Sequence, residues 1–199
     1  TCSDSGKWIL TLAARKAGGP MSLIAQGKNS IVLTNIAIGE VWIASGQSNM
    51  EWPLRQAFES EKAIANSAHP RIRLYTVPHL KADQPKDNVS ATWQVCGPDS
   101  VPGFSAVAYY FARDLQQALK VPIGIIHTSW GGSPAEVWMS EPVLAANPAY
   151  RQDILEAYKT HYVKYLEATI QWQKEKMDEE KKGGAFTKRA PGLSWKPAE

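Results

Sequence analysis

Apolar residues in the first 38 positions form short runs that turn residues interrupt. This pattern predicts strands at residues 8–12, 21–25 and 31–36, with turns at 17–20 and 27–30. Three short strands are too few for an independent β-domain. We therefore interpret residues 1–38 as the end of an N-terminal β-domain whose beginning is missing, or as an antiparallel edge of the sheet that follows.

The pattern changes at residues 37–45, which are almost continuously apolar. Such a run is typical of a strand that is buried on both faces of a parallel sheet. It ends at the turn Gly-Gln-Ser-Asn-Met, residues 46–50. Pro53 suits the first turn of a helix that carries Phe58 on its apolar face and ends before His69.

Strands and helices continue to alternate after this unit. A strand is predicted at residues 71–77, and a Pro- and Asp-rich loop follows it to about residue 102. Ser105 is the predicted N-cap of a helix over residues 105–120. The helical period gives this helix an apolar face made of Val107, Phe111, Leu115, Ala118 and Leu119.

A further apolar strand is predicted at residues 121–129, and it ends at a second Gly-rich turn, residues 130–133. Ser133 and Pro134 then suit the N-cap and first turn of a helix. This alternation predicts an α/β fold with a doubly wound parallel sheet and right-handed crossovers. In such sheets ligands bind beyond the carboxyl ends of the strands, where both Gly-rich turns fall.

Residues 151–182 form a long helical pattern that Gly183 and Gly184 end. We interpret it as a solvated helix whose aromatic stripe packs on the domain, rather than as a partner-binding or nucleic-acid-binding helix. Residues 185–199 are basic and contain Pro, which favours an exposed connection.

Composition narrows the class of protein. The chain is 44% hydrophobic and 21% charged, which is typical of a globular protein and excludes a disordered or collagenous chain. No apolar run approaches the roughly 18 residues of a membrane helix. The net charge of +3 comes from interspersed residues and is weak evidence for a nucleic-acid partner. We therefore expect neither a membrane nor a nucleic acid as partner.

The cysteines indicate neither a disulfide framework nor a metal site. Cys2 and Cys96 allow at most one disulfide, and no Cys/His cluster suggests a metal site. The sequence therefore does not predict a structural zinc site.

Ser48, in the first Gly-rich turn, is the candidate nucleophile. A catalytic serine must be exposed on a rigid element, beside a base, with backbone amides directed at the developing oxyanion. Gly46 permits the tight turn that such a serine needs, but Met50 stands where a GxSxG nucleophile elbow has its second glycine. The spacing alone leaves open whether Ser48 is a nucleophile or a structural residue of the turn.

Three blocks carry a family resemblance: EVWIASGQSNMEWP at 40–53, PGFSAVAYYFA at 102–112 and GIIHTSWGGSPAEVW at 124–138. Together with the Gly-Lys-Trp and Ala-Gly-Gly-Pro segments near the N-terminus, they resemble the sialate O-acetylesterase family of SGNH-type carbohydrate esterases. The resemblance implies an incomplete SGNH or flavodoxin-like doubly wound sheet. It divides the chain into residues 1–38, the tail of a β-domain; residues 39–150, the first part of the esterase domain; and residues 151–199, a long helical insertion with an exposed connection.

The resemblance also implies that the reaction needs no metal and no cofactor, and it implies roles for single residues. Ser48 would attack an acetyl ester on a sugar hydroxyl and form an acetyl-enzyme, and its own N–H would be the first oxyanion donor. Gly131 and Gly132 are candidates for the second donor, with Gly103 behind them. The other candidates for contact with the substrate are Gln47, Asn49, Ser133, Glu136 and Trp138. Of these, we expect Asn49 to shape the turn and Glu136 to hold a loop. Trp138 is expected either to stack on a sugar ring or to pack in the core.

The chain departs from the family in one respect. SGNH-type esterases of this kind take their base and its orienting acid from an Asp-x-x-His pair, and no Asp of this sequence has His three positions later. The Trp-Tyr-Gln-Gly-Glu-like block of the family is also absent. His127 is the one histidine on a predicted sheet strand near one of the two Gly-rich turns. A histidine in such a strand is typically hydrogen-bonded in the core and does not act as a base. We therefore expect a fragment that holds the nucleophile and is inactive alone.

The leading hypothesis is thus a sialate O-acetylesterase fragment that acts on an O-acetylated sugar and needs a complementary C-terminal portion of the same protein. One alternative is an acetylesterase for acetylxylan or another polysaccharide. A second alternative is a non-catalytic sugar-binding module on a degenerate esterase scaffold. The resemblance favours a secreted or periplasmic location.

Overall fold

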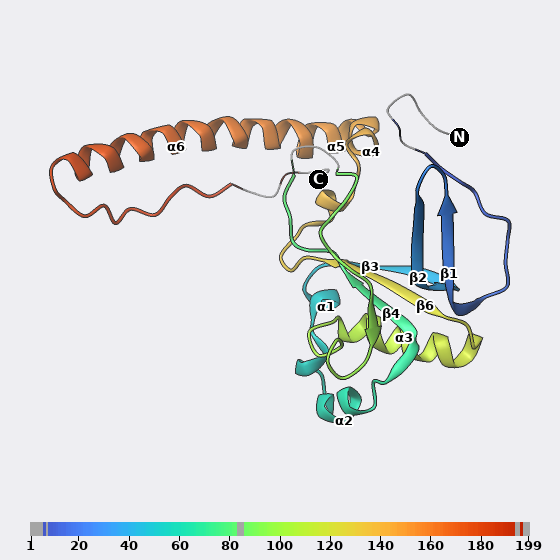
Figure 1. Ribbon diagram of the computed structural model, residues 1–199. Coiled ribbons are helices and arrows are strands. Elements are labelled where there is room, and N and C mark those ends of the chain that lie inside the picture. Colours follow the sequence, from blue (N-terminus) through green and yellow to red (C-terminus); the bar gives the residue numbers. More distant parts are fainter. Residues whose placement is uncertain (1–5, 7, 83–85, 194–195, 197–199) are drawn as a thin grey trace. The chain divides into compact units, whose positions relative to one another are not determined.

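The computed structural model describes residues 6, 8–82, 86–193 and 196 (Figure 1). The chain forms two compact units. The sheet unit contains residues 1–78 and 90–129, and the helical unit contains residues 79–89 and 130–199. Cys2 lies outside the described residues, as do parts of the expected connection at 185–199.

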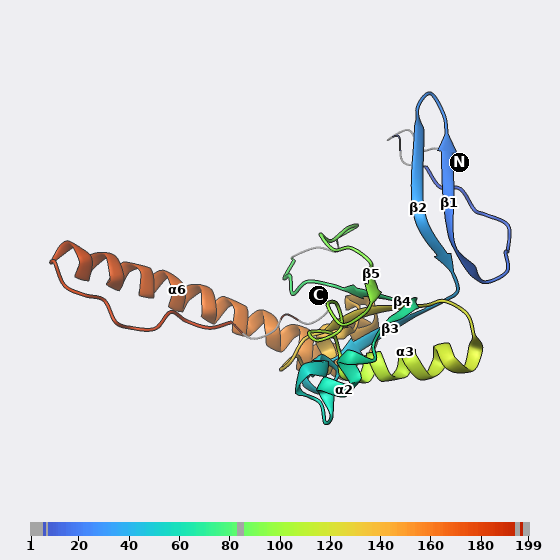
Figure 2. The same ribbon diagram turned by 60° about the horizontal axis from the view of Figure 1, so that its bottom comes forward.

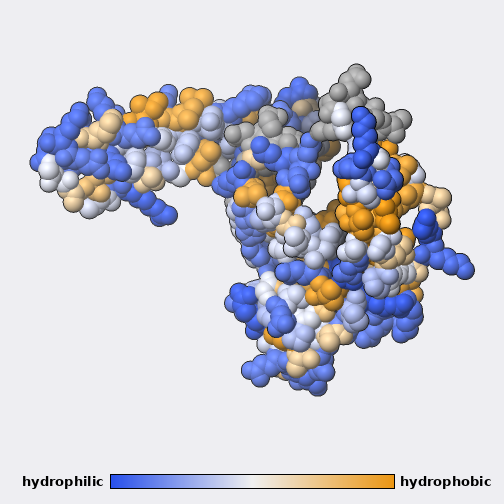
Figure 3. Space-filling view, viewed as in Figure 1, coloured by the Kyte–Doolittle hydropathy of each residue, from blue (hydrophilic) through white to orange (hydrophobic). Residues whose placement is uncertain are grey.

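The sheet unit begins with a hairpin of two antiparallel strands, β1 (Gly18–Gln26) and β2 (Ser30–Ile38). They contain the strands predicted at 21–25 and 31–36. The prediction of a strand at 8–12 is wrong, because residues 9–16 have no regular structure. A strand needs a hydrogen-bonded neighbour, which an apolar run alone does not supply. The hairpin bears exposed apolar side chains, among them Ile24 and Val32 (Figure 3).

A four-stranded sheet follows, made of β3 (Glu40–Gly46), β4 (His69–Thr76), β5 (Gln94–Cys96) and β6 (Ile123–Ser129). The strand order is β3-β6-β4-β5. β6 runs parallel to both β3 and β4, and β5 runs antiparallel to β4. The α/β class and three of the four strands were predicted, whereas β5 lies in the segment predicted as a loop.

The prediction that residues 37–45 are buried on both faces is wrong. Within the described residues β3 is an edge strand, and Val41, Trp42 and Ile43 are 60%, 44% and 69% exposed. The central strand is β6, where Ile123 and Ile125 are fully buried. An apolar run shows that a strand can be buried, but it does not identify the strand's neighbours.

The segment between β3 and β4 contains three short helices, α1 (Ser48–Glu51), η1 (Leu54–Gln56) and α2 (Ser60–Ala65). The prediction of one helix that begins at Pro53 is therefore wrong. The chain is extended at Ala57 and left-handed at Glu59, with φ of 50°, so no single helix can pass through. Phe58 is 89% exposed rather than part of an apolar face.

Helix α3 (Ala106–Leu119) covers one face of the sheet (Figures 1 and 2). Ser105 caps it as predicted, because the Ser105 Oγ accepts a hydrogen bond of 3.1 Å from the Ala108 N–H. Of the predicted apolar face, Leu115 packs against the core, but the prediction is wrong for Val107, Phe111 and Leu119, which are all more than 40% exposed. The buried residues of the helix are Ala106, Ala108, Tyr109 and Ala112.

The error arises because two apolar stripes with helical spacing run side by side on α3. The stripe with alanines faces the sheet, where small side chains allow close packing. Phe111 of the other stripe instead packs edge-on against Trp42 of β3, with ring centroids 5.2 Å apart. The core between helix and sheet includes Leu54, Ile72, Leu74, Val101, Phe104, Tyr109, Ile123 and Ile125.

The helical unit contains η2 (Ala135–Trp138), α4 (Glu141–Ala146), α5 (Pro148–Tyr150), the π-helical turn η3 (Arg151–Glu156) and α6 (Ala157–Lys181). The predicted long helix is thus confirmed, and Gly183 follows its end with φ of 75°. None of the described residues of α6 is buried, so its aromatic stripe is not the packed face we expected. The segment after α6 contacts it through Phe186, whose ring meets Trp172 edge-on at 5.5 Å.

None of the helices among the described residues combines the length and the apolar character that a membrane span requires. Cys96 is buried and is not part of a disulfide. Burial raises the pKa of the Cys96 thiol to about 11, so the thiol stays protonated at neutral pH.

Candidate active site

Ser48 lies at the carboxyl end of β3, as the first residue of α1. Its side chain is exposed, and its Oγ donates a hydrogen bond of 3.0 Å to Gln47 Oε1. The Met50 and Glu51 N–H groups both donate to the Gln47 carbonyl, at 2.9 and 3.1 Å, and so close the turn. The serine hydroxyl is therefore held on a short turn and faces solvent.

Gly46 makes this turn possible. Its φ of 144° lies in a region that residues with a Cβ rarely adopt. A Cβ at this position would also lie 3.4 Å from the Met50 Cβ. The backbone conformation, rather than a lack of space, therefore favours glycine at position 46.

The second motif block lies directly beside the first. The Leu54 N–H donates to the Phe104 carbonyl and the Ala106 N–H donates to the Trp52 carbonyl, each at 2.9 Å. The Ser105 hydroxyl also contacts Met50 Sδ at 3.6 Å. Two segments that are about fifty residues apart in the sequence are thus joined next to Ser48.

Gly103, a candidate oxyanion donor, lies in this second block. It is exposed, and a Cβ on it would lie 3.4 Å from Arg55 Nη1. The Arg55 N–H donates to the carbonyl of the preceding Pro102 at 3.0 Å. The loop that carries Gly103 is therefore fixed to the segment that follows Ser48.

The third block is aligned with the first through strand β6. The parallel register pairs Ala44 with His127 and Gly46 with Ser129. The two strands therefore end together, as expected for turns that share one edge of a sheet. Gly131 and Gly132 follow Ser129 by two and three positions and belong to the helical unit.

His127 is a core residue, as predicted. It is 5% exposed, and its Nε2 shares a hydrogen bond of 2.5 Å with Ser129 Oγ. Its ring packs edge-on against Phe104 at 5.2 Å. None of the hydrogen bonds found in the described part of the chain joins Ser48 to a histidine.

In the helical unit, Ser133 holds the second Gly-rich turn together. Its Oγ donates to the Trp130 carbonyl at 2.6 Å and accepts from Trp138 Nε1 at 2.9 Å. The prediction that Ser133 is an N-cap is wrong, because Pro134 occupies that position and the helix has no side-chain cap. Trp138 is 41% exposed, and Glu136 is partly buried in the same short helix.

One feature of this turn was missed by sequence reasoning, which predicted only a Pro- and Asp-rich loop around His79. The His79 ring stacks flat on Trp130, with centroids 4.3 Å apart and planes 9° from parallel. His79 follows the end of β4 by three residues, and Trp130 directly follows β6. Because β4 and β6 are neighbours, the position of His79 beyond a strand end was the available signal.

The structure thus distributes the candidate residues over both units. Gln47, Ser48, Asn49 and Gly103 belong to the sheet unit, whereas Gly131, Gly132, Ser133, Glu136 and Trp138 belong to the helical unit. Within the described residues no group of three or more His, Cys, Asp or Glu side chains is arranged to hold a metal ion.

Comparisons with known proteins relate these blocks to one family. A family model described as carbohydrate esterase, sialic acid-specific acetylesterase, matches residues 38–191. The sialate O-acetylesterases of Rattus norvegicus and Homo sapiens are 33% and 32% identical to the chain over 158 residues. These matches cover 71% and 72% of this chain but only 29% and 30% of the two relatives.

A solved structure agrees with this relation. A crystal structure described as a novel carbohydrate acetylesterase from Xanthomonas citri matches with a TM-score of 0.68 at 38% sequence identity. The match covers 71% of this chain and 33% of that one. The chain thus spans about a third of the length of the relatives it matches.

Proposed function

Because this chain belongs to the family of sialic acid-specific carbohydrate acetylesterases, we propose that it supplies the nucleophile of an esterase that removes O-acetyl groups from sialic acid. The observation that carries the proposal is the position of Ser48. It is exposed on a glycine-dependent turn at the carboxyl end of β3, with the second motif block hydrogen-bonded beside it and β6 ending in the same register.

In the proposed reaction, Ser48 Oγ loses its proton to a base and attacks the carbonyl carbon of the acetyl ester. The bond between that carbon and the sugar oxygen breaks, and the sugar oxygen leaves as a protonated hydroxyl. A water molecule then attacks the acetyl group on Ser48, which releases acetate and restores the serine hydroxyl.

The negative charge on the carbonyl oxygen requires hydrogen-bond donors. The Ser48 N–H is the first donor that we propose. Gly131 or Gly132 supplies the second, since both follow the strand that ends beside Gly46. Gly103 is the third candidate for the second donor.

None of the hydrogen bonds in the described part of the chain joins Ser48 to a base. Its hydroxyl donates to Gln47 Oε1, and an amide oxygen cannot remove a proton at neutral pH. We propose that an Asp-x-x-His pair in a complementary portion of the protein supplies the base and its orienting acid. The chain alone is then inactive, because loss of the base typically lowers the rate of a serine hydrolase by about 10³-fold or more.

The remaining candidates act around the nucleophile. Gln47 and Asn49 shape the turn and contact the substrate from either side of Ser48. Trp138, whose ring is partly exposed, stacks on the sugar, and Ser133 orients it through the hydrogen bond to its indole N–H. Glu136 holds the loop between them.

Two alternatives make different predictions. An acetylesterase for acetylxylan or another polysaccharide would use the same Ser48 chemistry on a different sugar. A non-catalytic sugar-binding module is favoured by one observation, namely that Ser48 is hydrogen-bonded to Gln47 rather than to a histidine. In that case the exposed aromatic side chains bind sugar and Ser48 is idle. We propose a secreted or periplasmic location for any of the three.

The test is acetate release from O-acetylated sialic acid and from acetylxylan. It compares the chain alone with the chain fused to the part of the Xanthomonas citri acetylesterase that the chain does not cover. We expect activity only in the fused protein, and its loss in Ser48→Ala but not in Ser45→Ala, which changes an exposed serine of the preceding strand β3. If the folded fused protein bound sugar but released no acetate, the result would instead support the non-catalytic sugar-binding module.

A further inference from the structure

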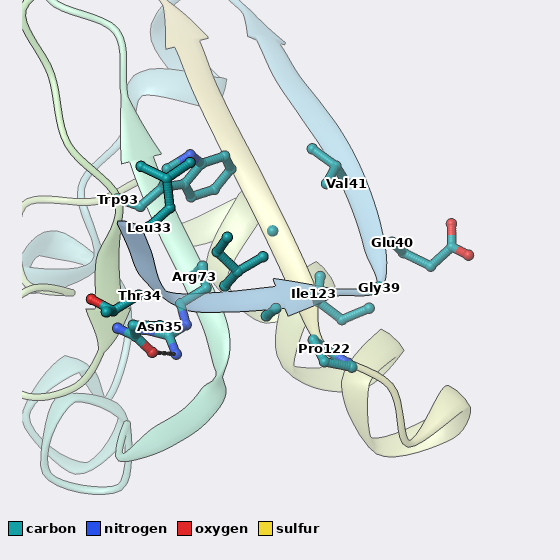
Figure 4. A pocket seen from close by; sticks show the side chains of 13 residues that line it. Leu33, Thr34, Asn35, Gly39, Glu40, Val41, Arg73, Trp93, Pro122 and Ile123 are labelled. Atoms are coloured by element: carbon teal, nitrogen blue, oxygen red, sulfur yellow. Dashed lines mark hydrogen bonds between the residues drawn. The ribbon is translucent and has the colours of Figure 1, made fainter. Parts of the chain in front are cut away.

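A cavity of about 470 Å³ lies in the sheet unit at the amino ends of β3 and β6 (Figure 4). Its walls come from the end of β2, the start of β3, and strands β4 and β6, and they include Leu33, Asn35, Val41, Arg73 and Trp93. Its volume is in the range of small-molecule sites, which combine apolar walls with a few placed polar groups. Ser48 follows the opposite end of β3, about 20 Å away at roughly 3.3 Å per strand residue.

The indole of Trp93 forms the apolar end of the cavity. A Cβ on Gly124 would lie 3.2 Å from the Trp93 ring, so glycine at position 124 lets the ring approach the strand closely. The ring also contacts Tyr75, with centroids 5.1 Å apart. Trp93 nevertheless remains 47% exposed, which leaves aromatic surface open for a ligand.

The guanidinium of Arg73 forms the polar end. Its Nη2 donates a hydrogen bond of 2.8 Å to Asn35 Oδ1, which fixes the side chain against the hairpin (Figure 4). The ion pairs found in the described part of the chain do not include Arg73. Glu40 also borders the cavity, but its carboxylate points away from Arg73 and Trp93 in Figure 4. A positive charge is therefore held in the wall without a carboxylate among the described residues to neutralise it.

We propose that this cavity is a second, non-catalytic binding site for a sugar that carries a carboxylate. A guanidinium with free N–H groups recognises a carboxylate through parallel hydrogen bonds. An aromatic ring at the other end stacks on the apolar face of a pyranose. The two groups bind different parts of one ligand, so a neutral sugar or a simple carboxylate binds less well than an acidic sugar.

The test is isothermal titration of the full chain carrying Ser48→Ala, which removes the nucleophile without touching the cavity. The probes are glucuronic acid, glucose, acetate and N-acetylneuraminic acid. Glucuronic acid and glucose differ only at one carboxylate, and acetate presents a carboxylate without a ring. We expect both acidic sugars to bind. Glucose and acetate should bind at least about tenfold more weakly, because each loses one of the contacts that an acidic sugar makes.

Variants assign the binding to the cavity. Arg73→Gln should weaken binding of the acidic sugars about tenfold or more, and Trp93→Ala should weaken binding of all sugars. Arg71→Gln is the matched control, because Arg71 lies on the same strand, donates to the Lys120 carbonyl at 2.8 Å and does not line the cavity. Circular dichroism of each variant verifies that it is folded.

Three results would overturn the proposal: no binding of either acidic sugar, equal binding of acetate and glucuronic acid, or equal effects of Arg73→Gln and Arg71→Gln. Binding of an apolar dye by the cavity without any sugar binding would show a surface that another polypeptide covers. The site does not depend on esterase chemistry, so an inactive Ser48 would leave this result unchanged.

Discussion

Gly46, the last residue of β3, pairs in parallel register with Ser129, the last residue of β6. Two positions after Gly46 comes Ser48, and two positions after Ser129 comes Gly131. The register of the two strands therefore ends β3 and β6 at the same edge of the sheet. This edge is where ligands of open α/β sheets bind.

The turn at Ser48 depends on Gly46, and replacing this glycine should destabilise the protein. Gly46→Ala forces a side chain into a backbone conformation with φ of 144° and brings its Cβ to 3.4 Å from the Met50 Cβ. We expect a loss of about 1–3 kcal/mol in the free energy of unfolding, measured by urea denaturation. Gly27→Ala is the control, because its Cβ would meet only the Asn29 carbonyl oxygen, at 3.9 Å. Equal effects of the two substitutions would contradict this account of the turn.

Helix α3 should depend on its N-cap. Ser105→Ala removes the hydrogen bond of 3.1 Å that the Ala108 N–H donates to Ser105 Oγ, at a position that is fully buried. The expected loss is about 0.5–2 kcal/mol in the free energy of unfolding. Ser48→Ala, at an exposed position, should change the same quantity by less than about 0.5 kcal/mol. If Ser105→Ala were as stable as Ser48→Ala, the cap would contribute nothing.

His69 should make stability depend on pH. Its Nε2 is buried and has no hydrogen-bond partner in the described part of the chain. Burial, aided by the positive charge of Arg113, lowers the pKa of His69 below its usual value of 6.5. The unfolded chain therefore binds a proton more readily than the folded one, and stability falls as the pH drops below about 6.5 toward the folded pKa.

Urea denaturation between pH 7.5 and pH 5 measures this dependence. His69→Gln should flatten the part of the pH dependence that lies below pH 6.5, because glutamine does not titrate. His161→Gln, at an exposed position of α6, should leave the slope unchanged. An identical slope for the native chain and His69→Gln would show that His69 is not the group responsible.

Several elements around the candidate site could be predicted from local sequence. Three of them carry a strong local signal. The strand at 121–129 is an apolar run, the helix at 105–120 begins at the capping residue Ser105, and the turn at 46–50 begins with Gly46. The three motif blocks identified the family, and the match to the family model over residues 38–191 confirms that identification. The strand, the helix and the turn depend on interactions between residues that are close together in the sequence.

The errors concern interactions between distant segments. The apolar run of β3 did not reveal that the strand lies at an edge of the sheet formed by the described residues, because its neighbours are set by the order of strands. The two stripes of α3 have the same spacing, and which one is buried depends on how closely the helix approaches the sheet. β5 has only three residues and exists because it pairs with β4, not because its sequence favours a strand.

The central claim, that Ser48 is the nucleophile, is tested most directly by trapping the acetyl-enzyme. The chain fused to the uncovered part of the Xanthomonas citri acetylesterase would be mixed with O-acetylated sialic acid, quenched in acid and digested. Mass spectrometry of the peptide that contains Ser48 should then show the added mass of one acetyl group on Ser48, and none in Ser48→Ala. Acetate release with an unmodified Ser48 peptide, or an acetyl group on a different residue, would contradict the account.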